Sequence, residues 1–298
     1  MKNNTTEDIA ATLAGALLTS KDDVESIFRM IPAITGHHAR TSELRALLDK
    51  IIKGHFGDHP SEILDTYPLD GMVWPHSSLG NLSSYSFFSF DELMLYSFYW
   101  INKGKYKTVF DLGANIGIDS IILGRFGFDV HAFEPDPQLF ETLSNNVSLN
   151  NCPNVHLHKK AVSNETGIAE FIRVEGNTTA SHIAGVRDYY GDAEHLTIET
   201  VAFQEIGIWP DLMKINIEGH ENSMIGGIDI KKWKNMDAFI EIHNVENGEG
   251  IYNYFAGSGI NIFAQNLGWE RVGKLAEMPM NNKEGYVFVS AKSEMPWA

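Results

Sequence analysis

The sequence predicts an α/β fold in which helices cover both faces of a mostly parallel β-sheet. Two observations lead to this prediction. From residue 108 onward, short apolar strand signals alternate with segments of helical period, which is the pattern of parallel strands joined by helices. The chain has 298 residues and is 43% hydrophobic, enough for one large core, alone or with a smaller appendage.

Residues 1–84 are predicted to form a mainly helical extension or cap, and residues 85–298 the main domain. The N-terminal segments with apolar residues at helical spacing are residues 8–18, 21–30 and 41–56. The stretch 55–85 is rich in Gly, Pro, Ser, Asp and His, which indicates an irregular connection. A further apolar helix is expected at residues 90–101.

The main domain is predicted to alternate strands and helices in chain order. Core strands are expected at residues 108–112, 129–133, 155–160, 212–217 and 238–242, and helices at residues 118–126, 137–149 and 252–267. Additional strands are expected at residues 169–174 and 196–203, and an antiparallel hairpin of residues 269–272 with 286–290 closes the domain.

Composition excludes several functions and compartments. The formal net charge is −16, which opposes binding to nucleic acid because such affinity depends on Lys and Arg that neutralise phosphates. Cys152 is the only cysteine, so nothing indicates an oxidising compartment. The apolar stretch Ile9–Leu18 follows two acids and is too short to span a bilayer. We therefore expect a cytoplasmic protein that acts on a small or neutral partner, with no membrane association.

A glycine turn follows the first core strand, at Asp111-Leu-Gly-Ala-Asn-Ile-Gly117. Ligands of open α/β sheets bind at the carboxyl ends of the strands, where backbone N–H groups and a helix N-terminus converge. The spacing differs from the Gly-x-Gly-x-x-Gly of dinucleotide folds, and Asp111 places a carboxylate where a pyrophosphate would lie. A ligand with an ammonium group fits better, and S-adenosylmethionine is such a ligand.

Glu134 ends the second core strand, in Phe133-Glu-Pro135. A carboxylate at this position accepts hydrogen bonds from ribose hydroxyls in nucleoside-binding α/β folds; a solvated acid at a strand end is the alternative. Ala161, near the end of the third strand, would border the adenine.

The fourth core strand carries Lys214, Asn216 and Glu218 at alternate positions, which places the three polar side chains on one face. Burying such groups is costly unless each is paired or bound to a ligand. We therefore expect Asn216 and Glu218 beside the sulfonium and the methyl acceptor, although a hydrogen-bonded polar ladder is the structural alternative.

Candidate proton acceptors lie at the predicted strand ends. His243 ends the fifth strand beside Glu241, and His220 closely follows Glu218. A histidine near the acceptor is suited to remove its proton, because its ordinary pKa is close to neutral, and Glu218 is the next candidate. The same residues could hold a divalent cation, but no metal motif of fixed spacing is present, so the metal stays unknown.

Three further features are open to two interpretations. The loop at residues 176–181 is either a lid over the donor or a flexible hairpin tip. The aromatic residues between Tyr85 and Trp100 either wall the acceptor pocket or, as we favour, pack in the core. His37 and His38 form a pair expected to be exposed to solvent.

The three motifs, taken in order, resemble the FkbM-type methyltransferases. They are Asp111–Gly117, Phe133–Pro135 and Asp211–Gly219. The resemblance covers about residues 85–292. It implies a class I methyltransferase Rossmann-like fold with a seven-stranded sheet, and in-line methyl transfer from S-adenosylmethionine to a hydroxyl of a small metabolite or sugar. It implies that Asp111, Gly113 and Gly117 hold the amino acid part of the cofactor and that Glu134 holds the ribose. Asn115, Pro135, Ala161 and Asn216 complete the set of expected cofactor contacts.

The chain departs from the family pattern at Asn216, where Lys-Ile-Asp-Val-Glu-Gly usually has aspartate. An amide can neither act as a carboxylate base nor carry its charge. Residues expected to act in catalysis are His243, His220, Glu218 and Asn216. The alternatives are a non-catalytic protein that binds S-adenosylmethionine, an N-, C- or peptide methyltransferase, and a nucleotide-dependent oxidoreductase, which the glycine spacing opposes. Oligomeric state is not indicated.

Overall fold

A computed structural model of the chain describes residues 90–175, 180–186 and 191–296, together with residues 8, 11, 46, 47, 50, 63, 64 and 71–73. The contacts divide the chain into two compact units, which are residues 1–78, 82–103 and 297–298 in unit 1, and residues 79–81 and 104–296 in unit 2. Most of the predicted N-terminal helices, the irregular connection, the boundary near residue 84 and the His37–His38 pair lie outside the described residues.

Unit 1 contains the helix expected before the first core strand. This helix, α4, spans Phe90–Asn102, and Asp91 and Glu92 lie in its first turn, where acids interact favourably with the helix dipole. Strands β1 (Ile63–Leu64) and β2 (Met72–Val73) pair antiparallel. Tyr96, Phe98 and Tyr99 of α4 are fully buried, which supports the packing role of the aromatic residues. Tyr85, Phe87 and Phe88 lie outside the described residues.

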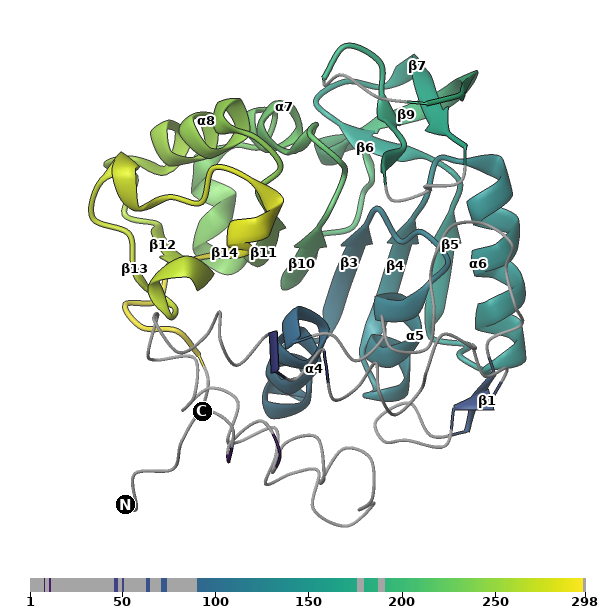
Figure 1. Cartoon of the computed structure of the whole chain (residues 1–298), viewed down its shortest axis with the longest axis horizontal. Helices are drawn as coiled ribbons and strands as arrows, with labels where there is room; N and C mark the ends of the chain where they lie inside the picture. The colour runs from purple at the N-terminus through teal and green to yellow at the C-terminus, as the bar shows by residue number, and fades with distance from the viewer. Residues whose placement is uncertain are drawn as a thin grey trace. The chain divides into compact units, whose positions relative to one another are not determined.

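Unit 2 is built on an eight-stranded sheet with the order β13-β12-β14-β11-β10-β3-β4-β5 (Figure 1). The strands are β3 (Thr108–Leu112), β4 (Asp129–Phe133), β5 (Val155–His158), β10 (Leu212–Ile215), β11 (Asp237–Glu241), β12 (Asn261–Ala264), β13 (Glu270–Arg271) and β14 (Tyr286–Ser290). Strands β5, β4, β3, β10 and β11 are parallel, and β14 runs antiparallel to β11 and β12. Apart from the two-residue edge strand β13, the sheet is the seven-stranded one expected.

Helices cover both faces of this sheet, as predicted. Register places Met213 beside Phe110 on one face, and both belong to the core that also contains residues of α7 (Glu221–Gly226) and α8 (Val245–Phe255). The same register places Lys214 beside Asp111 on the opposite face, where Asp111 contacts Ser120 of α5 (Ile118–Arg125). The sheet is therefore buried between two helical layers, which explains its nearly continuous apolar strands.

Helix α6 (Pro137–Leu149) has the bounds that the sequence predicts. Asp136 is its N-cap and accepts hydrogen bonds from the backbone N–H groups of Gln138 and Leu139, while Pro137 lacks an N–H that would otherwise be unsatisfied. The helix therefore starts directly after the strand end that carries Glu134.

Two predictions near the C-terminus are wrong. The expected helix at residues 252–267 is instead the end of α8, which finishes at Phe255, followed by β12. Gly257 and Gly259 have φ of 72° and 84°, which interrupts the helix. The expected hairpin is also absent, because β14 lies between β11 and β12 while β13 pairs with β12. Strand pairing here is non-local, and the local turn signals do not reveal it.

A second, four-stranded sheet with the order β6-β9-β7-β8 contains the additional strands. They are β6 (Ala161–Ser163), β7 (Gly167–Val174), β8 (His182–Ile183) and β9 (Ala193–Ala202). In Figure 1 strands β6, β7 and β9 lie beyond the arrowheads of β3 and β4, on the carboxyl side of the large sheet. Short 3₁₀ helices occupy Phe203–Glu205, Ile230–Asn235, Gln265–Leu267, Leu275–Glu277 and Asn282–Glu284. None of the helices described has the length and apolar character needed to cross a bilayer.

Candidate active site

The glycine turn after β3 is held between the two neighbouring parallel strands. The N–H groups of Gly113 and Ala114 both donate to the carbonyl of Phe133, at 3.0 Å each. Gly113 has a φ of 78°, and a Cβ placed on it would lie 1.9 Å from the backbone oxygen of Asn216. Only glycine fits, because both the left-handed backbone and the close approach exclude a side chain.

Glu134 lies directly after β4 and is only 4% exposed. Its Oε2 accepts from the Asn115 N–H at 2.8 Å, and its Oε1 accepts from the Asp136 N–H at 2.9 Å. Burial raises the pKa of Glu134 to about 7, although both hydrogen bonds act in the opposite direction. Each carboxylate oxygen keeps accepting capacity, so the side chain is oriented and still able to bind ligand hydroxyls.

Lys214 lies between two buried carboxylates, Asp111 and Asp119, next to the glycine turn. Its Nζ lies 3.2 Å from Asp111 Oδ1 and 3.5 Å from Asp119 Oδ2, and it donates to the carbonyl of Gly113 at 3.3 Å. Ser120 Oγ donates to the other oxygen of Asp111 at 2.5 Å. Burial raises the pKa of Asp119 to about 6, and the Lys214 charge opposes that rise. Lys214 therefore holds the glycine turn in place through Asp111 and the carbonyl of Gly113.

Sequence reasoning missed the contributions of Asp119 and Ser120. Both lie in the first turn of α5 and are buried, with exposures of 8% and 0%. The signal that could have found them is the pair of adjacent polar residues in an otherwise apolar helix start, because buried polar groups need partners.

Asn216 and Glu218 follow the end of β10 at Ile215. The Asn216 N–H continues the ladder by donating to the carbonyl of Leu112 at 3.0 Å. Its side-chain Oδ1 is buried without a hydrogen-bond partner among the described residues. Glu218 lies beyond the strand with a φ of 55°, so strand alternation does not extend to it. A turn, not the strand face, directs its carboxylate.

The carboxyl ends of β10 and β11 are joined by a cluster of one histidine and several carboxylates. His243, whose side chain is 3% exposed, has its Nδ1 3.0 Å from Glu221 Oε1 and its Nε2 3.3 Å from Glu218 Oε2. Glu241 Oε2 lies 3.7 Å from the same Nε2. Glu221 is fully buried and also accepts from the N–H groups of Ile217 and Gly219. Its contact with His243 is not predicted from the sequence.

The pKa values of both His243 and Glu241 are raised, and this sets the protonation state of each. Burial alone would lower the pKa of His243, but hydrogen bonds to Glu218 and Glu221 and their charges outweigh it and raise the pKa to about 11. Burial raises the pKa of Glu241 to about 7, against the opposing charge of His243. At neutral pH the histidine is therefore an imidazolium, and Glu241 is the group whose proton exchanges near pH 7.

His220 lies apart from that cluster, at the start of α7. The Ser163 hydroxyl donates to Asn164 Oδ1 at 3.1 Å, so the His220 Nε2, 2.9 Å away, donates to Ser163. This leaves the lone pair on Nδ1, a buried atom without a hydrogen-bond partner among the described residues. Burial lowers the pKa of His220, which keeps the ring neutral.

Arg173 of β7 connects the second sheet to the strand end that carries Glu134. Its Nε and Nη2 donate to the two carboxylate oxygens of Asp136 at 2.6 Å each. The Asp136 side chain is 1% exposed, and its N–H is the one that holds Glu134. This bidentate pair was not predicted, because Arg173 reads as an ordinary polar residue of an outer strand.

Replacing Arg173 with alanine is expected to destabilise unit 2 by about 3 kcal/mol, because it leaves the buried Asp136 carboxylate unpaired. It is also expected to weaken S-adenosylhomocysteine binding, since Asp136 orients Glu134. Urea unfolding and calorimetry measure the two effects. Glu194→Gln is the matched control: Glu194 pairs with the same arginine at 2.7 Å but is 54% exposed, so its loss should cost less than about 1 kcal/mol. Equal effects of the two variants would contradict this role.

The described residues fit a cationic nucleoside cofactor. Asn216 Oδ1 is a buried acceptor without a hydrogen-bond partner in the described part of the chain, and Glu134 is an oriented acceptor for hydroxyls. Pro135 is half-buried after Glu134, and Ala161 is buried at the start of β6. The loop expected to close over the donor lies mostly outside the described residues; its Ser181 accepts from the Val174 N–H through Oγ at 3.2 Å.

A group of converging ligand atoms is formed by different residues from those at the strand ends. Among the described residues, the group whose ligand atoms lie within 4.8 Å of one another is Asp129, His131 and His156. None of Glu218, His220, Glu241 and His243 belongs to it.

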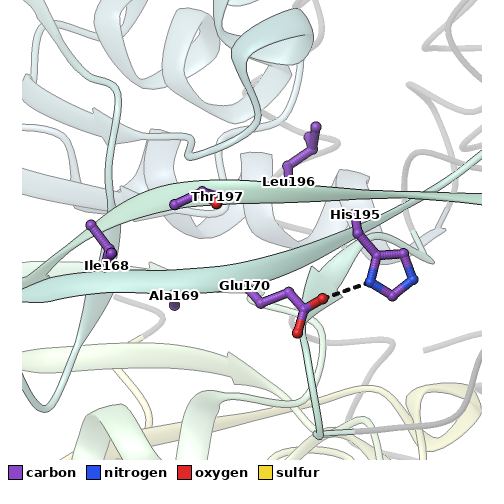
Figure 2. Close-up of a pocket in the computed structure, with 6 residues that line it drawn as sticks. All are labelled: Ile168, Ala169, Glu170, His195, Leu196 and Thr197. Atoms are coloured by element: carbon purple, nitrogen blue, oxygen red, sulfur yellow. Dashed lines mark hydrogen bonds and ion pairs between the residues drawn. The ribbon is translucent and has the colours of Figure 1, made fainter.

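A hollow of about 280 Å³ lies on the second sheet, between β7 and β9 (Figure 2). Figure 2 shows Glu170 and His195 paired at its side, and Ile168, Ala169, Leu196 and Thr197 complete its lining. Its lining combines the exposed Ile168, the partly buried Ala169 and Leu196, and the surface ion pair, and it contains none of the residues described above. It is therefore not part of the candidate active site.

The strand order and the strand-end acids define a class I methyltransferase fold. The model of the methyltransferase FkbM domain matches residues 111–268. The chain belongs to this family and is an S-adenosylmethionine-dependent methyltransferase.

Solved structures with limited likeness carry methyltransferase names. Precorrin-6y C5,15-methyltransferase from Geobacter metallireducens GS-15 is 12% identical, with 64% of this chain and 82% of that chain covered and a TM-score of 0.35. A putative rRNA-methylase from Clostridium thermocellum is 11% identical, with 66% and 94% covered and a TM-score of 0.38. A putative O-methyltransferase from Klebsiella pneumoniae is 10% identical, with 65% and 79% covered and a TM-score of 0.35. No curated protein matches the sequence.

Proposed function

We propose that this methyltransferase transfers a methyl group to a hydroxyl oxygen of a small metabolite or sugar. The observation that carries the proposal is Glu241, a partly exposed carboxylate with a pKa of about 7 at the end of β11. A hydroxyl must lose its proton as it is methylated, and a base whose pKa is near the working pH serves this best. The net charge of −16 favours a neutral acceptor over a polyanion.

The cofactor supplies a methyl group already activated by a sulfonium, so the chain's own task is binding, alignment and water exclusion. We propose that the turn from Asp111 to Gly117, including Gly113 and Asn115, lies against the amino acid part. Glu134 would bind the ribose, with Pro135 and Ala161 bordering the base. Asn216 would accept from the ammonium group through its unpartnered oxygen.

The proton acceptor we propose is Glu241, with His243 and Glu218 as its neighbours. The sequence favoured His243 or His220, but the raised pKa of His243 leaves it protonated. His220 bonds through Nε2 to Ser163 at 2.9 Å and makes no ion pair with Glu218 or Glu241 among the described residues, so we give it a positioning role. In this proposal His243 holds Glu218 and lowers the pKa of Glu241 by its charge, and His220 ties α7 to Ser163.

Glu241→Gln is expected to lower kcat about 100-fold or more, while the Kd for S-adenosylhomocysteine stays close to the wild-type value. In the wild-type enzyme kcat should fall as the pH drops below about 7, because Glu241 gains a proton there. His243→Ala should reduce turnover. It should also move the fall in kcat to higher pH, since it removes the charge that lowers the pKa of Glu241. Initial rates from pH 5 to 9 measure both.

Glu246→Gln is the control, since this acid lies nearby in the first turn of α8 but is exposed. A wild-type pH profile in the Glu241→Gln variant would exclude Glu241 as the base. The acceptor atom itself is tested by incubating the enzyme with methyl-labelled donor and paired alcohols and amines of the same carbon skeleton. Mass spectrometry should detect methyl ethers; N-methyl products alone would support the alternative class of acceptor.

A further inference from the structure

A cluster of histidines lies at the β5 edge of the large sheet. Asp129 and His131 belong to β4, and His156 and His158 belong to the edge strand β5. Register places His131 directly beside His156, on the face that also carries Phe110. Asp129 begins β4 and Glu134 follows its end, so the two lie about 16 Å apart along the strand. The cluster is therefore separate from the candidate active site.

The side chains of Asp129, His131 and His156 converge. One ligand atom from each lies within 4.8 Å of the others, and His156 Nε2 is 2.8 Å from Asp129 Oδ1. Tetrahedral zinc with bonds near 2.0–2.1 Å requires ligand atoms about 3.4 Å apart, so small side-chain rotations suffice. His156 and Asp129 have room to rotate, since their side chains are 48% and 43% exposed.

His131 is held in place for such a role. It is 7% exposed, and its Nδ1 lies 3.0 Å from the Nε2 of His158. The rings of His131 and His158 are stacked, with an angle of 18° between their planes. The ring of Phe133 also stacks on His158, at 14°. Histidine ligands of metals usually bond through their second ring nitrogen to a neighbouring group that fixes the ring. His158 provides that contact here.

We propose that Asp129, His131 and His156 bind a divalent transition-metal ion of the zinc type, with His158 orienting His131. Two imidazoles and one carboxylate, with a water in the remaining position, are a ligand set that zinc accepts. Because the ligands come from β4 and β5, the ion cross-links the edge strand to its neighbour and stabilises the folded chain.

Zinc titration of the full-length chain, without an affinity tag, in competition with a chromophoric chelator tests this proposal. We expect one ion bound per chain with a Kd of roughly 1 μM or tighter, and a zinc-dependent rise in the unfolding temperature. His156→Ala and Asp129→Asn should each weaken binding at least tenfold and abolish that rise. Both side chains are about half exposed, so the variants should fold.

His195→Ala is the matched control, because His195 also pairs with a carboxylate, Glu170, at 2.7 Å and is 52% exposed. It should bind zinc as the wild type does. Absence of zinc binding by the wild-type chain, or equal affinity of the His156→Ala variant and the wild type, would overturn the proposal. Equal losses in the His156→Ala and His195→Ala variants would also overturn it, because they would indicate adventitious binding to surface histidines.

Discussion

Gly113→Ala is expected to abolish detectable S-adenosylhomocysteine binding and to lower the free energy of unfolding by roughly 4 kcal/mol, near the upper limit for a single substitution. The new Cβ would lie 1.9 Å from the Asn216 backbone oxygen and 3.0 Å from its carbonyl carbon. Both atoms belong to the backbone at the end of β10, so neither can move aside without displacing the strand. Separation of β3 from β10 would also displace Asn216 and Glu134.

Gly127→Ala is the matched control for the backbone conformation. Gly127 has a φ of 93°, and a Cβ there would have no atom within 4 Å. Its substitution should cost only the left-handed strain of about 1–2 kcal/mol and leave affinity unchanged. Calorimetry with S-adenosylhomocysteine and urea unfolding measure the difference. Normal affinity in a folded Gly113→Ala variant would mean that this turn does not form the cofactor site.

Lys214→Met is expected to destabilise the protein by about 3–5 kcal/mol at pH 8, because it leaves Asp111 and Asp119 buried together without their cation. The loss should be smaller at pH 5. Burial already raises the pKa of Asp119 to about 6, and removal of the lysine charge raises it further, so Asp119 takes up a proton as the pH falls. Urea unfolding of both proteins at the two pH values measures this difference.

Two further variants distinguish a buried charge from an ordinary ion pair. Lys160→Met removes a pair of the same length, 3.2 Å to Glu199, whose side chains are 47% and 65% exposed; we expect a loss below about 1 kcal/mol. Adding Asp119→Asn to Lys214→Met should recover part of the stability at pH 8. A pH-independent loss, or no recovery in the double variant, would contradict the account of Lys214 as a neutralising residue.

The sequence predicts best where local chemistry and burial agree. Helix α6 has an N-cap at Asp136 and a proline at its first position, and the parallel core strands are short apolar runs, so their location follows from pattern alone. Segment 261–264 is also short and mostly apolar, but such segments are compatible with helix and strand. The insertion of β14 between β11 and β12 depends on non-local packing and leaves no local signal.

In the candidate site, too, the sequence predicts features set by local pattern and does not predict those that depend on non-local packing. Asp111, Gly113 and Glu134 lie at the carboxyl strand ends where the spacing predicts them, and Lys214 has the buried partners that its place in an apolar strand requires. The sequence does not predict that His243 lies between Glu218 and Glu221, because those residues come from a turn and a helix start. The raised pKa of His243, which keeps the ring protonated at neutral pH, depends on that three-dimensional arrangement.

A crystal structure of the chain with S-adenosylhomocysteine is the most direct test of the central claim, that the cofactor binds over the carboxyl ends of β3 and β4. We expect the ribose hydroxyls within hydrogen-bond distance of the Glu134 carboxylate and the amino acid part beside Gly113 and Asn216. Ligand bound elsewhere, or Glu134 without any contact to the ligand, would show that the cofactor site is misplaced.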